Sequence, residues 1–131
     1  FYKKAMLAFI PHRYFMKRSL YWACENMVQT KEGREIADWF LEANILAIKC
    51  FKTKLPAYLS VMSNEEIQSI TVPVLYLDGE DNKGLSPTTA VERLHRLAPD
   101  IKTEVIPNAG HGLVFTHSET VSEKILDFLN N

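Results

Sequence analysis

A change of hydrophobic period near the middle of the chain most constrains its fold. Residues 72–77, Val-Pro-Val-Leu-Tyr-Leu, form a nearly continuous apolar run that ends at Asp78. A short run of this kind, closed by polar residues, is typical of a strand that is covered on both faces in a parallel sheet. Pro73 is tolerated because it lies near the expected start of the strand. Residues 72–77 therefore predict a buried parallel strand.

A helix, a second strand and a last helix are predicted after this run. Ser86 can cap a helix that has Pro87 in its first turn, and Pro99 ends that helix. Residues 103–106 are the second strand candidate, and the last helix opens at Ser118. A crossover between two parallel strands is right-handed by strong default.

The residues before this unit have the period of helices. Apolar side chains recur at steps of three or four over residues 36–50, which predicts one apolar helix face. Further helices are expected over 2–10 and 12–30. The Ser-x-x-Glu spacing at 63–66 predicts a capping box that opens a short helix. The predicted fold class is therefore α/β, with helices followed by a strand–helix–strand–helix parallel unit.

Composition and charge exclude several classes of protein. Of the 131 residues, 47% are apolar and 24% are charged, which are fractions of globular rather than disordered chains. No stretch approaches the ~20 apolar residues of a membrane span, so we predict no membrane contact. The net charge is −1, but residues 1–55 carry a balance of +5 and the remainder −6. Because the basic side chains are scattered and no nucleic-acid motif accompanies them, we favour a solvated helical surface over a nucleic-acid interface.

The cysteines and the start of the chain bear on its compartment. Cys24 and Cys50 lie in apolar helical sequence, which predicts two buried free thiols. We see no secretory signal with a basic start and an apolar stretch, so we predict a cytoplasmic protein. The chain starts at Phe1 rather than Met and enters helical sequence at once. We therefore expect a piece of a longer protein.

Two loops at the strand ends carry the residue types that chemistry needs. In open parallel sheets, ligands and reacting groups gather just past the carboxyl ends of the strands. The acidic loop 78–84 follows the first strand, and the loop 107–112 carries His111 between two glycines. A carboxylate from the first loop would orient the imidazole and stabilise its charged form, as in the acid–base half of a nucleophile–His–acid triad.

The same loops do not have the spacing of metal sites. In the acidic loop, Gly84 is one place late for an EF-hand, and Thr89 stands where the bidentate Glu should be. His111 and His117 have no further metal-ligand cluster beside them. We therefore predict no metal site and no cofactor.

Together these segments resemble a known family. The pattern Val-Pro-Val-Leu-Tyr-Leu-Asp-Gly-Glu at 72–80, followed after a helix by Ile-Pro-Asn-Ala-Gly-His at 106–111, resembles the C-terminal part of the α/β-hydrolase family. The resemblance implies that residues 1–62 are a helical cap and that 63–131 are the C-terminal portion of the hydrolase core. It also implies that the two strands are the seventh and eighth of the family's sheet, and that His111 matches the catalytic general base.

The sequence leaves open which residue is the acid of the triad. The family usually places Asp or Glu three residues after the strand-end glycine, and counting from Gly79 gives Asn82. An amide can orient the histidine ring but cannot supply negative charge. Either Asp81 takes the role through a local shift of the loop, or the acid comes from elsewhere, or the triad is defective.

The nucleophile is missing from the chain. None of its glycines frames a serine in the family's Gly-x-Ser-x-Gly elbow, whose strained turn exposes the hydroxyl. The chain alone is therefore expected to be inactive. The first hypothesis is that it is the C-terminal fragment of a carboxylesterase-like serine hydrolase whose full-length protein hydrolyses an ester or amide of a small molecule. The alternative is a non-catalytic hydrolase-like module for binding or assembly with a degenerate triad, which Asn82 motivates.

Two further expectations follow from the first hypothesis. The aromatic residues of the cap either wall an apolar substrate pocket or fill the cap's own core; they are Phe15, Tyr21, Trp22 and Trp39. The strand at 72–77 would lack its sixth-strand neighbour and would expose an apolar, unpaired edge. We therefore expect the fragment to dimerise or to pair through that edge.

Overall fold

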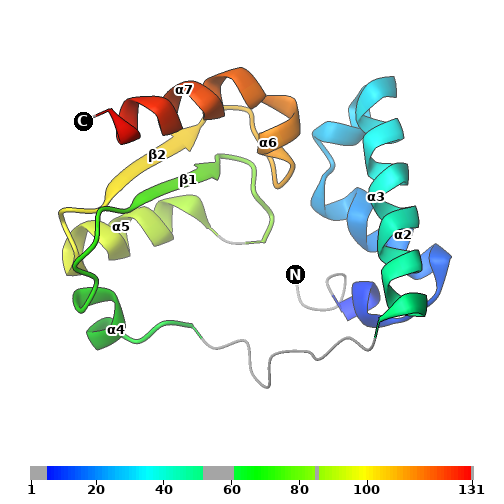
Figure 1. Ribbon diagram of the computed structural model, residues 1–131, viewed down its shortest axis with the longest axis horizontal. Helices are drawn as coiled ribbons and strands as arrows, with labels where there is room; N and C mark the ends of the chain where they lie inside the picture. Colours follow the sequence, from blue (N-terminus) through cyan, green and yellow to red (C-terminus); the bar gives the residue numbers. More distant parts are fainter. Residues whose placement is uncertain (1–5, 52–60, 85, 131) are drawn as a thin grey trace.

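The computed structural model describes residues 6–51, 61–84 and 86–130 (Figure 1). In chain order, its elements are η1 (Met6–Phe9), α2 (Arg13–Ala23), η2 (Met27–Gln29), α3 (Lys31–Cys50), α4 (Asn64–Gln68), β1 (Leu75–Gly79), α5 (Pro87–Leu97), β2 (Lys102–Ile106), α6 (Leu113–Thr116) and α7 (Ser118–Leu129). The two η elements are short 3₁₀ helices. No helix in the described residues is both long enough and apolar enough to cross a membrane.

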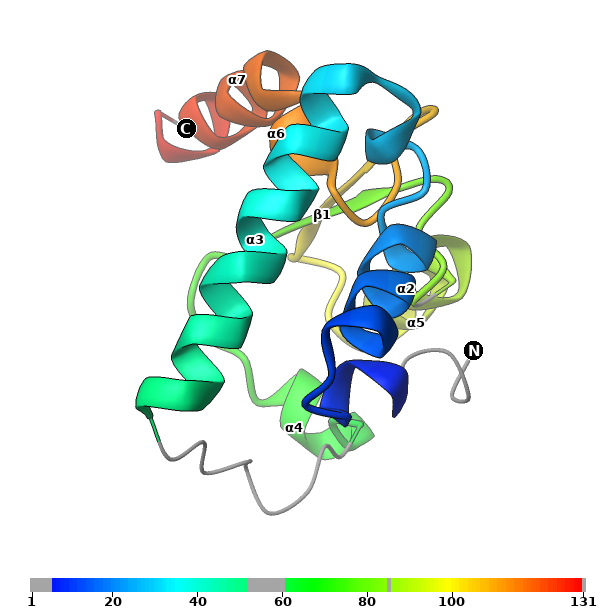
Figure 2. The same ribbon diagram turned by 90° about the vertical axis from the view of Figure 1, so that its right-hand side faces the viewer.

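The two strands form a parallel pair. Leu75 lies opposite Lys102 and Gly79 lies opposite Ile106. Helix α5 makes the crossover between the strands, and α5 and α7 lie on opposite sides of them (Figures 1 and 2). The order strand, helix, strand, helix is therefore confirmed. Parallel pairing brings the carboxyl ends of β1 and β2 to the same edge of the sheet.

The predicted bounds of the first strand are wrong by two to three residues. The prediction was 72–77, whereas β1 spans Leu75–Gly79. The ladder with β2 continues through Asp78 opposite Val105, so Asp78 belongs to the strand rather than to the loop. The partner strand decides these bounds, and a local apolar pattern does not record where the partner begins.

The predicted helix over 12–30 is two elements. Helix α2 ends at Ala23, where the backbone N–H of Cys24 donates to the carbonyl of Leu20, and η2 follows. The side chain of Thr30 then caps α3 by accepting from the backbone N–H of Gly33 at 2.9 Å. The predicted helix over 2–10 lies partly outside the described residues, and its remainder is the 3₁₀ turn η1.

Both predicted helix caps in the second half are confirmed. Ser63 and Glu66 form a capping box in which each side chain accepts from the other residue's backbone N–H. Ser86 caps α5 by accepting from the backbone N–H of Thr89, and Pro87 stands in the first turn. These contacts satisfy donors that a helix start leaves without partners.

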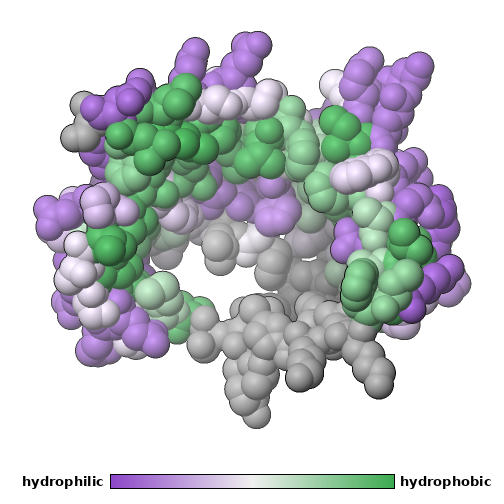
Figure 3. Space-filling model, viewed as in Figure 1, coloured by the Kyte–Doolittle hydropathy of each residue, from purple (hydrophilic) through white to green (hydrophobic). Residues whose placement is uncertain are grey.

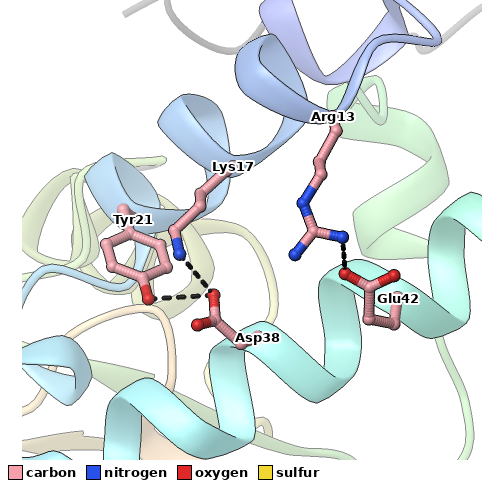
Figure 4. Close-up of polar contacts among 5 residues, drawn as sticks. All are labelled: Arg13, Lys17, Tyr21, Asp38 and Glu42. Atoms are coloured by element: carbon pink, nitrogen blue, oxygen red, sulfur yellow. Dashed lines mark hydrogen bonds and ion pairs between the residues drawn. The ribbon is translucent and has the colours of Figure 1, made fainter.

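The two long helices of the first half pack side by side and are joined by polar side chains (Figure 4). Asp38 accepts from Lys17 Nζ at 2.8 Å and from the Tyr21 hydroxyl at 2.9 Å, and Arg13 pairs with Glu42. Arg13 on α2 pairs with Glu42 on α3, whereas Lys17, later on α2, pairs with Asp38, earlier on α3. The two helices therefore run antiparallel. The hydrogen bond from Lys17 lowers the pKa of Asp38, and the same bond raises the pKa of Lys17.

The apolar core of this half is small. It contains the buried residues Cys24, Met27 and Ala37, of which Ala37 is 0% exposed. Burial raises the pKa of the Cys24 thiol. Cys50 is exposed, so the prediction of a second buried thiol is wrong. Cys50 is the last residue of α3, and an apolar period does not record where along a helix the covering elements end.

We expect Asp38→Asn to reduce the acid sensitivity of the fold. Because the folded-state pKa of Asp38 is lowered, its contribution is present above the unfolded-state pKa of about 3.9 and is lost as the pH falls through the lower folded-state value. The side chain is 42% exposed, so the contribution is less than about 1 kcal/mol. Urea unfolding of both proteins at about pH 7 and about pH 2 gives the free energy of unfolding that each loses on acidification.

Glu35→Gln is the matched control, because Glu35 lies on the same helix and pairs only at 3.9 Å with Lys31. The control should keep the acid sensitivity of the unsubstituted chain. An Asp38→Asn variant that loses as much stability on acidification as the unsubstituted chain would contradict the assignment.

Candidate active site

A buried carboxylate stands at the carboxyl end of β1. Asp78 is 4% exposed. It accepts from the Tyr76 hydroxyl at 2.6 Å, from the backbone N–H of Gly79 at 2.8 Å and from the side-chain amide of Asn82 at 2.6 Å. Tyr76 and Asp78 share a face because side chains alternate along a strand. Both carboxylate oxygens act as acceptors, which is what an ionised carboxylate provides.

Tyr76 is a half-buried hydrogen-bond partner of Asp78. Burial first, and then the hydrogen bond to Asp78, raise the pKa of the Tyr76 hydroxyl above its usual value. A phenol next to a buried carboxylate stays protonated and acts as a donor. The Tyr76 hydroxyl is therefore a fixed hydrogen-bond donor to Asp78.

Asn82 connects Asp78 to the second loop. Its Nδ2 donates to Asp78 Oδ1, and its Oδ1 accepts from the backbone N–H of Gly84 at 2.9 Å. The same Oδ1 lies 3.3 Å from His111 Nδ1. The structure therefore brings together two of the predicted site residues, Asn82 and His111.

His111 is in the loop after β2, as predicted, and its side chain is exposed. An amide oxygen only accepts hydrogen bonds, so in the contact with Asn82 the Nδ1 atom of His111 carries the hydrogen. Within the residues that the structure describes, Nε2 makes no hydrogen bond. In this tautomer Nε2 carries the lone pair, which is the form that a general base needs.

Asp81, the candidate acid, faces a different partner. Its Oδ2 accepts from the side-chain amide of Asn26 at 2.8 Å, and its backbone N–H donates to the carbonyl of Ala109 at 2.8 Å. No hydrogen bond joins Asp81 to His111 among the described residues. Asn26 also donates to the backbone carbonyl of Asn108, at 3.3 Å. Asp81 thus ties the first half of the chain to the acidic loop.

The turn before η2 reaches both loops of the site. Besides the bonds of Asn26, Glu25 forms an ion pair with Lys83 of the acidic loop. Met27 lies beneath Gly112, where an added Cβ would be 3.1 Å from its sulfur. No local pattern in the sequence marks this turn as part of the site, because its role depends on contacts across more than 50 positions.

The two loops also bind one another directly. The backbone N–H of Glu80 donates to the carbonyl of Ile106 at 3.0 Å, and Glu80 Oε2 accepts from the backbone N–H of Asn108 at 3.1 Å. Asn108 has a φ of 55°, in the left-handed region that Asn tolerates better than most residues. A Cβ at Gly79 would overlap the carbonyl oxygen of Ala109. The loop of His111 is therefore held closely against the end of β1.

An open apolar hollow lies between α3 and α6, the short helix that follows the loop of His111 in the chain. Its lining consists of Glu32, Glu35, Ile36, Trp39, Phe40 and Phe115. The rings of Phe40 and Phe115 meet edge to face at 5.2 Å, and Trp39 is 66% exposed. Tyr21 packs against the core of the first half instead. The apolar surface continues over α6 and α7 (Figure 3), where Val114, Phe115, Ile125, Leu126 and Leu129 are exposed.

Potential metal ligands do not gather anywhere in the described part of the chain. No group of three or more His, Cys, Asp and Glu side chains has a geometry that could hold an ion there. The chemistry that this arrangement supports is proton transfer at His111.

Comparison with known proteins places the fold. The chain is similar in sequence and structure to the C-terminal part of α/β-hydrolases, and its fold is a partial α/β-hydrolase fold. Over 70 residues it is 40% identical to "Uncharacterized carboxylesterase nap" of Bacillus subtilis (strain 168), covering 53% of this chain and 23% of that protein. Over 69 residues it is 39% identical to "Carboxylesterase YbfK" of the same organism, with the same coverage.

Solved structures extend the similarity to nearly the whole chain. The naproxen esterase (carboxylesterase NP) of Bacillus subtilis superposes with a TM-score of 0.77 at 26% identity, covering 98% of this chain and 44% of that one. The carboxylesterase CesB (YbfK) of Bacillus subtilis gives 0.74 at 26% identity, with the same coverage. No protein-family model matches the chain. The chain thus spans less than half the length of these relatives.

We expect Gly79→Ala to displace the loop of His111. The new methyl group would overlap the carbonyl oxygen of Ala109 and lie 2.9 Å from that of Gly110, and both are backbone atoms that cannot rotate away. Unfolding in urea should show a loss of about 2 kcal/mol or more. The amide NMR signals of residues 107–112 should shift.

Gly110→Ala is the matched control, since the nearest atoms to a methyl group there belong to the Asn26 side chain, at 3.3 Å. That side chain can move by a few tenths of an ångström, so the loss should be smaller. Equal losses for the two variants would contradict the close packing described for Gly79.

Proposed function

We propose that this chain is the C-terminal part of a carboxylesterase-like serine hydrolase and that His111 is its general base. The observation that carries the proposal is the contact of His111 Nδ1 with Asn82, which leaves Nε2 free to accept a proton. The similarity to carboxylesterases supports the same reaction class. The substrate class that we propose is an ester or amide of a small molecule.

In this proposal the nucleophilic serine comes from a segment outside these 131 residues, because no Gly-x-Ser-x-Gly elbow occurs within them. His111 Nε2 takes the proton of the serine hydroxyl as the oxygen forms its bond to the substrate carbonyl carbon. His111 then gives that proton to the departing alcohol or amine. A water molecule, deprotonated by the same Nε2, releases the acid and restores the serine.

Residues 1–62 serve as the cap in this proposal, and residues 63–131 serve as the C-terminal portion of the core. The support for the cap is physical contact: Asn26 and Glu25 hold the acidic loop through Asp81 and Lys83. The hollow between α3 and α6 offers an apolar wall for the substrate.

His111→Ala should abolish reaction with a fluorophosphonate probe in the full protein. Such probes phosphonylate an activated serine, and a lost general base costs on the order of 10⁴-fold or more in rate. Peptide mass spectrometry should locate the labelled serine outside these 131 residues. His117→Ala is the control, because the hydrogen bond of the His117 ring goes to its neighbour Thr116 and not to a residue of the proposed site.

A full protein that the probe does not label would favour the second candidate, a non-catalytic binding or assembly module. The observation that favours this candidate is the amide of Asn82 at the family's acid position. Binding without turnover needs no negative charge at that position.

We also propose that β1 accepts a further strand along its open edge. β1 pairs only with β2 among the described residues, and an unpaired edge offers a row of backbone donors and acceptors. This edge belongs to residues Leu75–Gly79, the observed bounds of β1, rather than to the predicted 72–77. Light scattering of this chain alone should give a mass above 15.0 kDa, and a stable monomer would contradict the proposal.

A further inference from the structure

We propose that Asp78 is a positioning residue for His111 and supplies, through the amide of Asn82, the negative charge that Asn82 lacks. This inference rests on the proposed role of His111 as the general base. It assigns a role to a residue of the strand itself, three positions before Asp81 and four before Asn82. The three side chains form a relay from Asp78 through Asn82 to His111.

Two hydrogen bonds make the relay. Asn82 Nδ2 donates to Asp78 Oδ1 at 2.6 Å, and His111 Nδ1 lies 3.3 Å from Asn82 Oδ1. A carboxylate can only accept, so the atom of Asn82 that faces Asp78 must be the nitrogen. The backbone N–H of Gly84 can only donate, so the atom that it reaches must be the oxygen. Two independent partners therefore fix the amide in one orientation.

The fixed amide selects one form of the imidazole. Asn82 Oδ1 faces the ring, so Nδ1 carries the hydrogen and Nε2 carries the lone pair. The tautomer of a histidine is set by the hydrogen bond that one of its nitrogens makes. Asp78 influences the tautomer indirectly. It accepts the hydrogen bond of Asn82 Nδ2 and so keeps Asn82 Oδ1 turned toward the ring.

The charge of Asp78 acts in the same direction. The three groups that bind Asp78 are neutral: the Tyr76 hydroxyl, the Gly79 N–H and the Asn82 amide. The carboxylate is 4% exposed, so water screens it little. Hydrogen bonds in a chain polarise one another, and the Asn82 oxygen next to the ring becomes more negative. The relay thus stabilises His111 when it takes a proton.

The relay also explains why an amide suits position 82. A carboxylate there would meet the carboxylate of Asp78 across the 2.6 Å contact, and two like charges at that distance share one proton. The pair of an acid at 78 and an amide at 82 therefore carries one negative charge in total. Exchanging the two residue types would keep this balance and place the charge directly beside His111.

Asp78→Asn is the sharpest substitution, because it removes the charge and preserves the contacts. The retained oxygen can still accept from the N–H of Gly79 and from Asn82, as Oδ1 does now. The new amide nitrogen can donate to the Tyr76 hydroxyl. Glu104→Gln is the matched control, because it removes a carboxylate charge from β2, where Glu104 pairs with Lys124 at 3.1 Å, without touching the relay or the loop of His111.

In the full protein, Asp78→Asn should lower kcat for ester hydrolysis about 10- to 100-fold at nearly constant KM. Loss of an acid in direct contact with the histidine costs about 10⁴-fold, so the effect through an amide is smaller. Asn82→Asp should also lower kcat, and the double variant Asp78→Asn with Asn82→Asp should recover it to within about threefold. Glu104→Gln should change kcat less than threefold. An unchanged kcat in Asp78→Asn, or a gain in Asn82→Asp alone, would overturn the relay.

A second readout needs no turnover and separates the relay from the proposed function. The ¹⁵N shifts of the His111 ring, recorded on the neutral form, report which nitrogen carries the hydrogen. The Nδ1–H tautomer should dominate in the unsubstituted protein and in Tyr76→Phe, which leaves the Asp78 charge in place. Its share should fall in Asp78→Asn and fall further in Asn82→Ala. Equal shares in the unsubstituted protein and in Asp78→Asn would overturn the relay, even in a protein that hydrolyses no ester.

Discussion

The rest of the site depends on how the buried carboxylate of Asp78 is satisfied. A charge that is removed from water must find hydrogen bonds inside the protein. One donor lies two positions back on the strand, one is the next backbone N–H, and the third is the side chain of Asn82. The third donor requires the loop after β1 to fold back toward the strand end. That return places the amide of Asn82 opposite His111.

A second constraint is how closely β1 approaches the loop after β2. Parallel pairing ends at Gly79 and Ile106. Past it, the backbone N–H of Glu80 donates to the carbonyl of Ile106, and that of Asp81 donates to the carbonyl of Ala109 in the second loop. The approach leaves no room for a side chain at position 79. The first half of the chain then closes this junction from outside through Asn26. The site therefore joins three segments that are distant in the sequence.

Local patterns predicted the elements that local interactions determine. The caps at Ser63 and Ser86 depend on residues three positions away, and both are confirmed. Partner-dependent features were missed: the strand end at Gly79, the break after Ala23 and the short helix α6. The proximity of Asn82 and His111 could be predicted from the sequence, because the loops that carry them follow two parallel strands that end at the same edge of the sheet. Asp78 was missed because it was placed in the loop, although its alternation with Tyr76 along the run was a usable signal.

The amide at position 82 cannot be judged apart from the residue at position 78. Sequence left three possibilities open: Asp81 as the acid, an acid from elsewhere, or a defective triad. The carboxylate of Asp81 is hydrogen-bonded to Asn26, whereas Asn82 is hydrogen-bonded to a buried acid on one side and contacts His111 on the other. A histidine needs a correctly oriented acceptor at Nδ1 and, near it, a negative charge that water screens little, as in the buried carboxylate of Asp78. In the proposed relay, two side chains divide these tasks between them, so an acid position without an acid remains compatible with general-base chemistry.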